Sequence, residues 1–417
     1  MKLAVVGGGS TYTPELVDGI ARLGLPVAEI VLVDPDAHRL ELVGGVSSRI
    51  AAAYGHPAKV RGTDNLDDGL DGAGTVILQL RIGGQAARQR DETWPLECGC
   101  VGQETTGAGG LAKALRTVPV VLEIAERVRE RAPSAWIIDF TNPVGIVTRA
   151  LLDSGHRAIG LCNVAIGLQR MFAALLGVEP ERITLGHVGL NHLSWERSVR
   201  VNGTDLLPGL LDAHGEQIAA EIGLPVDLVR EMGAVPSYYL RYYYAHDEVV
   251  AQRRGARTRA EEVAELERRL LAMYADPALD RKPPLLGERG GAYYSDAAVA
   301  LIASLTADAG DIQVVNVRNS GTLGFLPAGS VIEAPAQIGS KGAVPLSTAP
   351  VEPLLAGLIA HVSAYEELAL EAALRGGRER VFAALLAHPL VGQAHTARLL
   401  SDRMIAENRA YLAWAAG

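Results

Sequence analysis

The chain has 417 residues, and its 39 Lys and Arg against 48 Asp and Glu give a formal net charge of -9. Charges of both signs are interspersed, which excludes the global basic surface typical of nucleic-acid binding. Three cysteines are too few to staple a chain of this length, the first strand follows Met1 with no signal-peptide pattern, and no apolar run reaches the length of a membrane span. We therefore expect a soluble, cytoplasmic protein with two closely packed lobes.

The first predicted elements are a strand over residues 2–6, a glycine turn over residues 7–9 and a helix that begins at Thr13 and Pro14. Such a turn lets the backbone approach a pyrophosphate, whose charge is stabilised by the free N–H groups at the helix start. Tyr12 stands at the third glycine position of the dinucleotide motif, so a plain tight turn is the alternative. The candidate dinucleotide-binding residues of this segment are Gly7, Gly9, Ser10 and Thr11.

The next strand-like run, residues 29–34, ends in Asp34. A carboxylate at this point accepts the ribose hydroxyls of NAD and repels the extra phosphate of NADP, although a surface aspartate at a strand end is the alternative. Further strand-like runs alternate with helical stretches such as residues 113–131, and this alternation predicts an α/β fold with a doubly wound parallel sheet. The runs cover residues 75–80, 135–140 and 157–162. We predict an N-terminal Rossmann NAD-binding domain over residues 1–165 and a mixed α+β domain for substrate, metal and oligomerisation over residues 166–417.

Polar segments follow the predicted parallel strands, at the edge where such sheets bind ligands. Cys162 and Asn163 follow one strand, and His192 lies in a later segment among apolar residues. A thiolate and an imidazole from the two lobes can hold a cation, and these ligand types alone suggest zinc or iron before manganese. The alternative for each residue is a structural role, as an inert buried cysteine and a satisfied histidine.

Tyrosines are dense over residues 235–247. Most of them are expected to pack in the core, but one hydroxyl near a metal-bound substrate can act as a base because the cation favours its anionic form. The rest of the chain predicts a sequence of further elements. These are a helix over residues 167–177, strands around residues 183–203, a charged helix with a solvated face near residues 257–275, a strand and turn over residues 312–327, and largely helical structure over residues 350–417.

Taken together, these segments resemble glycoside hydrolase family 4, whose members are NAD-dependent glycosidases. The resemblance spans most of the chain and rests on the order and approximate spacing of its motifs. These are GGGSTYTPEL, RIGG, GQETTGAGG, TNPVGIVT, GLCNVAIG, GLNHLSW, YLRYYY, RGGAYYS and NVRNSGTLGFLP.

The resemblance implies that Cys162 and His192 hold a divalent ion, typically manganese. It implies that Tyr239 is the base, with Tyr238 beside it as the alternative. The implied reaction moves a hydride from C3 to NAD, removes the C2 proton, eliminates the aglycone from C1, adds water and returns the hydride. The resemblance also implies a homodimer or a homotetramer.

Three further residues take roles from the resemblance. Asn142 and Glu104 would line the site of the sugar, the metal and the cofactor. Asn163 stands where family members that act on α-linkages have an acid, so this chain is similar to the β-type pattern.

The segment DETWPL, residues 91–96, bears on the group at C6 of the sugar. Phospho-glycosidases of the family usually have a cation where Thr93 stands, so a hydroxyl and the indole N–H of Trp94 favour an anion of lower charge. We expect a glucoside with an anionic C6 group, with a sulfonate as in sulfoquinovosides first and a 6-phospho-β-glucoside as the alternative. Arg88 and Lys282 are the candidate cations for this anion.

Two other classes of protein share part of the pattern. A 2-hydroxy-acid dehydrogenase would have the glycine turn, Asp34 and the TNPV motif, and His187 resembles its catalytic histidine, but it would not need Cys162 together with His192. A non-enzymatic NAD-sensing protein would need neither the metal ligands nor the tyrosine.

Overall fold

The computed structural model describes residues 1–290 and 293–415. Its strands are β1 (Lys2–Val6), β2 (Glu29–Val33), β3 (Lys59–Thr63), β4 (Thr75–Leu78), β5 (Trp136–Asp139), β6 (Ala158–Gly160), β7 (Ile183–Leu190), β8 (Leu193–Val201), β9 (Thr204–Asp205), β10 (Val235–Pro236), β11 (Ile312–Arg318), β12 (Val331–Gly339) and β13 (Gly342–Pro345). They form one sheet in the order β10-β8-β7-β12-β11-β6-β5-β4-β1-β2-β3, with β9 beside β8 and β13 beside β12.

The half of the sheet from β3 to β6 is parallel throughout. Its order, β3-β2-β1-β4-β5-β6, is that of doubly wound dinucleotide-binding sheets, which confirms the predicted α/β fold class. The sequence did not predict β3, because its polar, partly exposed residues at the sheet edge make no apolar run.

The other half is antiparallel and continues directly from β6 through β11, β12, β7 and β8. The strand region predicted around residues 183–203 is the hairpin of β7 and β8. The two halves thus share one sheet, with the parallel strands in one half and the antiparallel strands in the other. The carboxyl ends of the parallel strands and the turn between β7 and β8 become parts of one framework.

The helices are α1 (Thr13–Arg22), α2 (Ala37–Ala53), α3 (Leu66–Leu70), α4 (Gly84–Glu97), α5 (Gly107–Arg131), α6 (Val144–Asp153), α7 (Val164–Leu176), α8 (Leu207–Ile222), α9 (Val226–Met232), α10 (Arg241–Tyr244), α11 (His246–Arg253), α12 (Arg259–Tyr274), α13 (Tyr294–Ala307), α14 (Pro353–Arg375), α15 (Arg378–Ala387) and α16 (Ala394–Asn408). None of them, among the described residues, is long and apolar enough to cross a membrane. The mostly helical C-terminal region agrees with its prediction.

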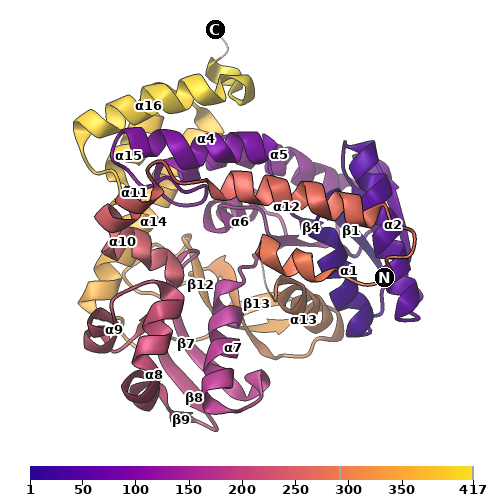
Figure 1. Cartoon of the computed structure of the whole chain (residues 1–417), viewed down its shortest axis with the longest axis horizontal. Helices are drawn as coiled ribbons and strands as arrows, with labels where there is room; N and C mark the ends of the chain where they lie inside the picture. The colour runs from indigo at the N-terminus through magenta and orange to yellow at the C-terminus, as the bar shows by residue number, and fades with distance from the viewer. Residues whose placement is uncertain (291–292, 416–417) are drawn as a thin grey trace.

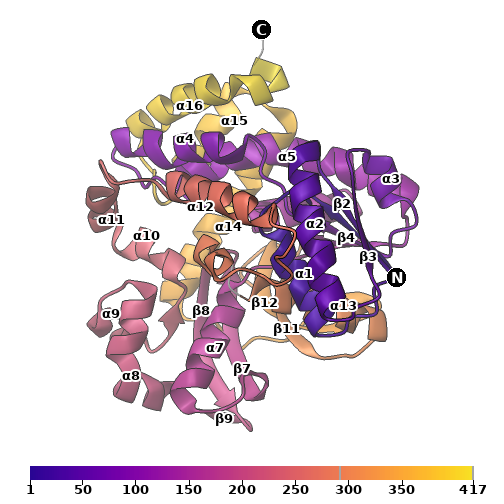
Figure 2. The same ribbon diagram turned by 45° about the vertical axis from the view of Figure 1, so that its right-hand side comes forward.

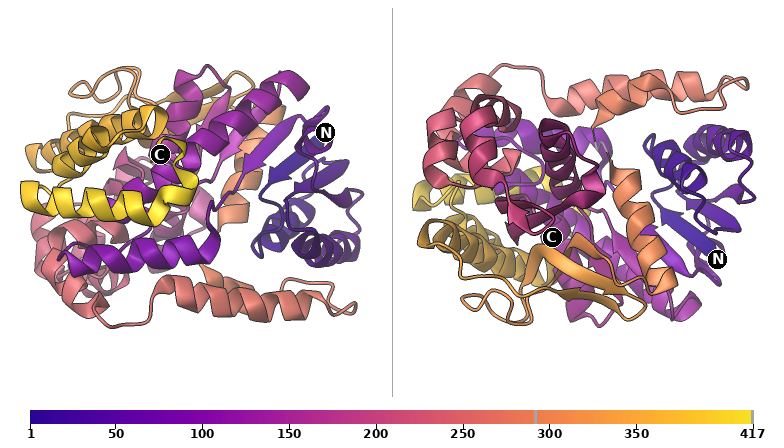
Figure 3. Two further views of the ribbon diagram at one scale, coloured as in Figure 1. Left: turned by 90° about the horizontal axis from the view of Figure 1, so that it is seen from above. Right: turned by 90° about the horizontal axis from the view of Figure 1, so that it is seen from below.

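Helices cover both faces of the parallel half. Alternate side chains of β1 point to opposite faces, so Ala4 and Val6 join a buried cluster with α5 and α6, while Leu3 and Val5 join another with α1, α2 and α13. Figure 2 shows α1 and α2 packed on the strands of this half, and Figure 1 shows α8 and α9 at the opposite end of the molecule. In Figure 3, α12 runs along the outside of the molecule beside α4.

Buried polar contacts of Arg116 connect the first half of the chain to the C-terminal helices. Arg116 of α5 donates to both carboxylate oxygens of Asp91 on α4, and also to the side chain of Asn408 on α16. The side chains of Arg116 and Asp91 are 2% and 1% exposed. Burial raises the pKa of Asp91 to about 6 although the guanidinium opposes this rise.

Arg116→Met should therefore be strongly destabilising, because it leaves a buried carboxylate without its cation. We expect a loss of about 3–5 kcal/mol in the free energy of unfolding, measured by urea denaturation with circular dichroism. Arg375→Met is the control, since Arg375 is 68% exposed in its pair with Glu371, and it should cost less than about 1 kcal/mol. Equal losses in the two variants would contradict the role given to the buried pair.

Candidate active site

A cavity of about 1160 Å³ opens where β1, β2, β4, β5 and β6 end. Ligands of doubly wound sheets bind at this edge. The predicted site residues that line the cavity are Gly7, Gly9, Ser10, Asp34, Arg88, Glu104, Asn142, Asn163 and Tyr239. Residues far apart in the sequence therefore meet around one space.

The glycine turn forms one end of the cavity. Gly7 has a φ of 84°, and a Cβ there would lie 2.6 Å from the carbonyl oxygen of Gln79, so the turn needs glycine. The N–H of Gly9 donates to the carboxylate of Asp34 at 3.0 Å. Asp34 thus lies against the turn, at the place where a dinucleotide ribose is held in such folds. Thr11 belongs to the same turn but is fully buried and does not line the cavity.

Glu104 is the electrostatic centre of the cavity wall. Its carboxylate forms ion pairs with Arg81, with Lys113 at 2.8 Å and with Arg88 at 3.2 Å. The cations hold the pKa of Glu104 well below its usual value although burial opposes this effect, and burial lowers the pKa of Lys113 to about 8. Arg88 also pairs with Glu92 at 2.7 Å. The carboxylate of Glu104 is therefore ionised and fixed in place.

His192 lies in the two-residue turn between β7 and β8, with a φ of 62°. A positive φ in a residue other than glycine is strained, and such residues cluster at functional sites. The Nδ1 atom of His192 is 3.0 Å from the hydroxyl of Thr105, and the ring of Tyr239 stacks on the imidazole at a centroid distance of 3.6 Å. Burial lowers the pKa of His192 to about 4, so the imidazole is neutral at pH 7. A neutral imidazole is the form that binds a metal ion.

Cys162 is buried just after β6, and its thiol hydrogen-bonds with the side chain of Asn191. It lies within electrostatic range of Tyr239 and Glu333, and both of these residues also neighbour His192. Burial raises the pKa of the Cys162 thiol well above its usual range. A cation would offset this rise, since metal binding deprotonates a coordinating thiol.

Cys162 and His192 fit a divalent cation only if other groups complete its shell. No cluster of three or more His, Cys, Asp or Glu side chains with metal-binding geometry occurs within residues 1–290 and 293–415. The remaining ligands must then be substrate or water oxygens. Asn142 offers a further buried polar group at the cavity, because its Oδ1 atom finds no hydrogen-bond partner in the described part of the chain.

Three predicted anion-binding residues are not brought to this cavity. Lys282 pairs with Glu15 at 3.0 Å on the side of α1. Trp94 is 2% exposed and packs in the core, where its N–H has no partner among the described residues. The hydroxyl of Thr93 donates to backbone carbonyls of its own helix, and Thr93 faces a separate cavity of about 610 Å³.

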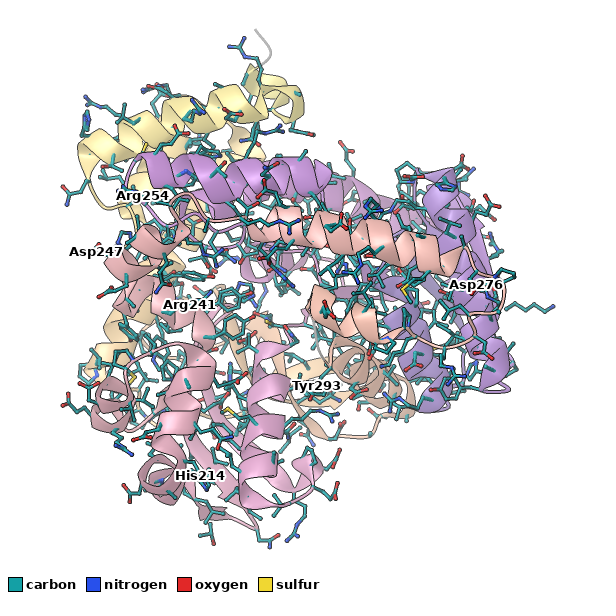
Figure 4. All side chains as sticks on the ribbon, viewed as in Figure 1. His214, Arg241, Asp247, Arg254, Asp276 and Tyr293 are labelled. Atoms are coloured by element: carbon teal, nitrogen blue, oxygen red, sulfur yellow. The ribbon has the colours of Figure 1, made fainter. Side chains whose placement is uncertain are left out.

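The end of α11 and the loop before α12 supply cations that the sequence analysis did not single out. Arg253 and Arg257 line both cavities, and neither forms an ion pair among the residues described, although Glu261 and Glu265 lie within electrostatic range of Arg257. The density of arginine in the segment QRRGARTR was the available signal. Figure 4 shows Arg254 beside α4 and α11, with Arg241 of α10 below it, and Arg241 also lines the large cavity.

The charged helix α12 is not simply a solvated face, as the sequence had suggested. Its Glu267 lines the large cavity and pairs with Arg289 at 3.0 Å, and its Ala260 N–H donates to Glu92 at 2.9 Å. One side of α12 therefore closes the site.

His388 supports the loop that carries Glu104 and Thr105. Its Nε2 atom lies 3.1 Å from the N–H of Gly107, at the start of α5, and its Nδ1 atom lies 3.0 Å from the N–H of Leu390. In the doubly protonated imidazolium, each ring N–H would point at one of these backbone N–H groups, and this repulsion disfavours the charged form. Burial lowers the pKa of His388 to about 3.

Comparison with known proteins gives a consistent result. The chain matches the family model described as family 4 glycosyl hydrolase over residues 2–178 and that of the family 4 glycosyl hydrolase C-terminal domain over residues 187–391. It is 37% identical over 431 residues to a probable 6-phospho-beta-glucosidase of Bacillus subtilis, covering 99% of this chain and 97% of that one. It is 36% identical over 432 residues to the 6-phospho-beta-glucosidase of Escherichia coli, covering 99% and 96%. A solved structure of the Thermotoga maritima 6-phospho-beta glucosidase with manganese, NAD+ and glucose-6-phosphate is 34% identical, with a TM-score of 0.93 and 99% of both chains covered.

The lowered pKa of His388 predicts loss of stability in acid. Below pH 6.5 the unfolded chain takes up a proton that the folded imidazole accepts only near pH 3, so the free energy of unfolding falls as the pH falls. His388→Gln keeps an acceptor for the Gly107 N–H but does not titrate. We expect this variant to lose less stability than the parent between about pH 7.5 and about pH 5 in urea titrations, by up to about 1.4 kcal/mol per pH unit. The exposed His395 provides the control, and His395→Gln should follow the parent.

Proposed function

Because this chain belongs to glycosyl hydrolase family 4 and is a glycosidase, we propose that it hydrolyses 6-phospho-β-glucosides with NAD and a divalent metal ion, manganese by analogy with its solved relative. The observation that carries this proposal is the cavity that joins the glycine turn and Asp34 to Tyr239 and to Arg253, which forms no ion pair among the described residues. Membership of a glycosidase family sets aside the hydroxy-acid dehydrogenase and the NAD-sensing alternatives.

In this proposal the glycine turn and Asp34 hold NAD, and Cys162 and His192 hold the metal ion. When bound, NAD takes and returns the C3 hydride, while the cation polarises the C3 oxygen and so acidifies the C2 proton. Tyr239 removes that proton, and the bond from C1 to the aglycone oxygen then breaks. Water supplies the proton of the aglycone alcohol and the hydroxyl that adds to C1, and Tyr239 returns a proton to C2. Asn142 and Glu104 orient the sugar within the cavity. Residues 166–417 carry His192, Tyr239 and the oligomer contacts in the predicted division of the chain.

Tyr239 is the better of two neighbouring candidates for the base. Its ring stacks on His192, whereas Tyr238 lies farther out and is 37% exposed. The Tyr239 hydroxyl hydrogen-bonds to that of Tyr238, and burial raises the pKa of Tyr239 well above its usual value. Proton removal by Tyr239 therefore depends on a cation at His192, which couples the base to the metal site.

The C6 phosphate is proposed to bind between Arg88 and the α11–α12 loop. Arg253 and Arg257 line the cavity, and Arg253 forms no ion pair among the described residues, so its charge is available to a dianion. The earlier preference for a C6 sulfonate rested on Thr93 and Trp94 as donors. The helix carbonyls already hold the one hydroxyl hydrogen of Thr93, and the core encloses the N–H of Trp94. Neither supports that preference.

Asn163 supports the β-linkage. It lines the cavity directly after Cys162, at the position where an acid would protonate an α-linked leaving group according to the family resemblance. An asparagine cannot supply that proton.

The substrate class is tested with matched 4-nitrophenyl β-glucosides that carry phosphate or sulfonate at C6, in the presence of NAD, manganese and reductant. We expect kcat/KM to favour the phosphate by at least about tenfold, or about 1.4 kcal/mol. Arg253→Gln should raise KM for the phosphate substrate, whereas Arg254→Gln, which changes an arginine that lines only the smaller cavity, should not. Preference for the sulfonate substrate would overturn the proposed C6 group while leaving the glycosidase mechanism in place.

The base is tested by comparing Tyr239→Phe with Tyr238→Phe. Loss of a general base lowers kcat by about 10²- to 10⁴-fold, and we expect this loss in Tyr239→Phe alone. In deuterium oxide the product formed by the parent and by Tyr238→Phe should carry deuterium at C2, detected by NMR. Equal effects of the two substitutions on kcat and on C2 labelling would remove Tyr239 from this role.

A further inference from the structure

A buried polar network lies behind the candidate metal ligands and has no role in the mechanism above. His187 of β7 lies between two carboxylates, at 2.7 Å from Glu196 of β8 and 3.1 Å from Glu333 of β12. The side chains of His187 and Glu196 are 0% exposed, and that of Glu333 is 2% exposed. Two acids around one imidazole are costly to bury unless another group benefits from their charge.

The network leads directly to both candidate ligands. The Glu333 carboxylate accepts hydrogen bonds from the side chain of Asn191 at 3.3 Å and from that of Asn316 at 3.0 Å. Asn191 precedes His192 in the turn and hydrogen-bonds with the thiol of Cys162. Glu333 is thus hydrogen-bonded to Asn191, the residue that interacts with the Cys162 thiol and directly precedes His192.

The charges of the network match those that a divalent cation would need. With His187 protonated, the two carboxylates and the imidazolium leave a net charge of about minus one. The two carboxylates raise the pKa of His187 to about 10, although burial opposes this rise, so the imidazolium persists at pH 7. The second oxygen of Glu196 has no hydrogen-bond partner in the described part of the chain, so no local donor stabilises the charge on this oxygen.

A divalent cation held by one thiolate and one neutral imidazole keeps an excess charge of about plus one, which a low-dielectric interior disfavours. The excess positive charge of such a site and the excess negative charge of the network are of equal size. Each is costly alone, and because the two are opposite in sign, each lowers the cost of burying the other.

We propose that Glu333, hydrogen-bonded to His187, is a positioning residue for the metal site: it holds Asn191 against Cys162 and supplies the negative charge that balances the cation. This inference rests on the proposed function, in which Cys162 and His192 bind the ion. Residues behind metal ligands commonly tune affinity by about 10- to 100-fold.

The test measures Mn²⁺ affinity of the full-length protein by electron paramagnetic resonance of the free ion, with NAD affinity by fluorescence as a check on folding. Glu333→Gln keeps the shape and a carbonyl acceptor for Asn191 but removes the charge. We expect its Kd for Mn²⁺ to rise by about 10- to 100-fold, with an unchanged Kd for NAD. Glu333→Asp, which keeps the charge, should recover part of the affinity.

Glu196→Gln provides a second, independent variant. Within residues 1–290 and 293–415, Glu196 forms no hydrogen bond with Asn191, so this change leaves the hydrogen bond of Glu333 intact and alters only the net charge. It should weaken Mn²⁺ binding in the same direction. Glu352→Gln is the control, because Glu352 is an exposed carboxylate in a pair with Arg197, and it should leave Mn²⁺ affinity unchanged.

Unchanged Mn²⁺ affinity in both Glu333→Gln and Glu196→Gln, with Cys162→Ala binding weakly, would overturn the role of Glu333 and leave the metal site in place. If Cys162→Ala binds Mn²⁺ as well as the parent, the proposed metal site itself fails, and the role of Glu333 fails with it. The two failures are therefore distinguishable in one set of titrations.

Discussion

The close approach of β6 and β11 at Gly160 is the constraint on which the site depends. Gly160 pairs with Asn316 across the junction between the parallel and antiparallel halves. A Cβ at Gly160 would lie 2.2 Å from the Thr148 hydroxyl and 2.9 Å from the Asn316 Cβ, so only glycine allows the two strands to pair. The junction immediately precedes Cys162, and Asn316 donates to Glu333. One backbone contact therefore sets the distance between the end of the dinucleotide-binding sheet and the carboxylate network of the other half.

Around this framework the charges of the cavity divide into two groups. Arg81, Arg88 and Lys113 converge on the buried Glu104, and Arg88 also pairs with Glu92, so the positions of these cations are fixed while an excess of positive charge remains. Such an arrangement is preorganised, so it can orient a bound sugar without rearranging. Arg253 ends α11 and Arg257 lies on the loop before α12, and neither forms an ion pair among the described residues. In the proposed function, the phosphate would therefore lie between Arg88 and the more exposed arginines, with the sugar toward the buried Glu104.

Much of the first half could be predicted because its signals are local. The glycine turn, Asp34 and the apolar runs that became β1, β2, β4, β5 and β6 each lie within a few residues, and their order in the sheet follows from the fold class. The polar edge strand β3 has no such signal. The network of His187, Glu196 and Glu333 joins residues from separate strands, and its members meet only through the register of β7, β8 and β12. Strand register across more than a hundred residues cannot be derived from spacing or composition.

The segment DETWPL shows how secondary structure decides which side chains can meet a ligand. These residues lie within α4, so successive side chains are rotated by about 100° around the helix axis. Arg88 and Glu92, four positions apart, share the face that lines the cavity, as that spacing requires. Thr93 and Trp94 follow Glu92 by one and two positions and turn away, one toward the smaller cavity and the other into the core. Two adjacent donors on a helix cannot both contact an anion that binds at another face of that helix. In the proposed function, selectivity for the C6 group therefore comes from residues on another element. The arginines that precede α12 line the same cavity.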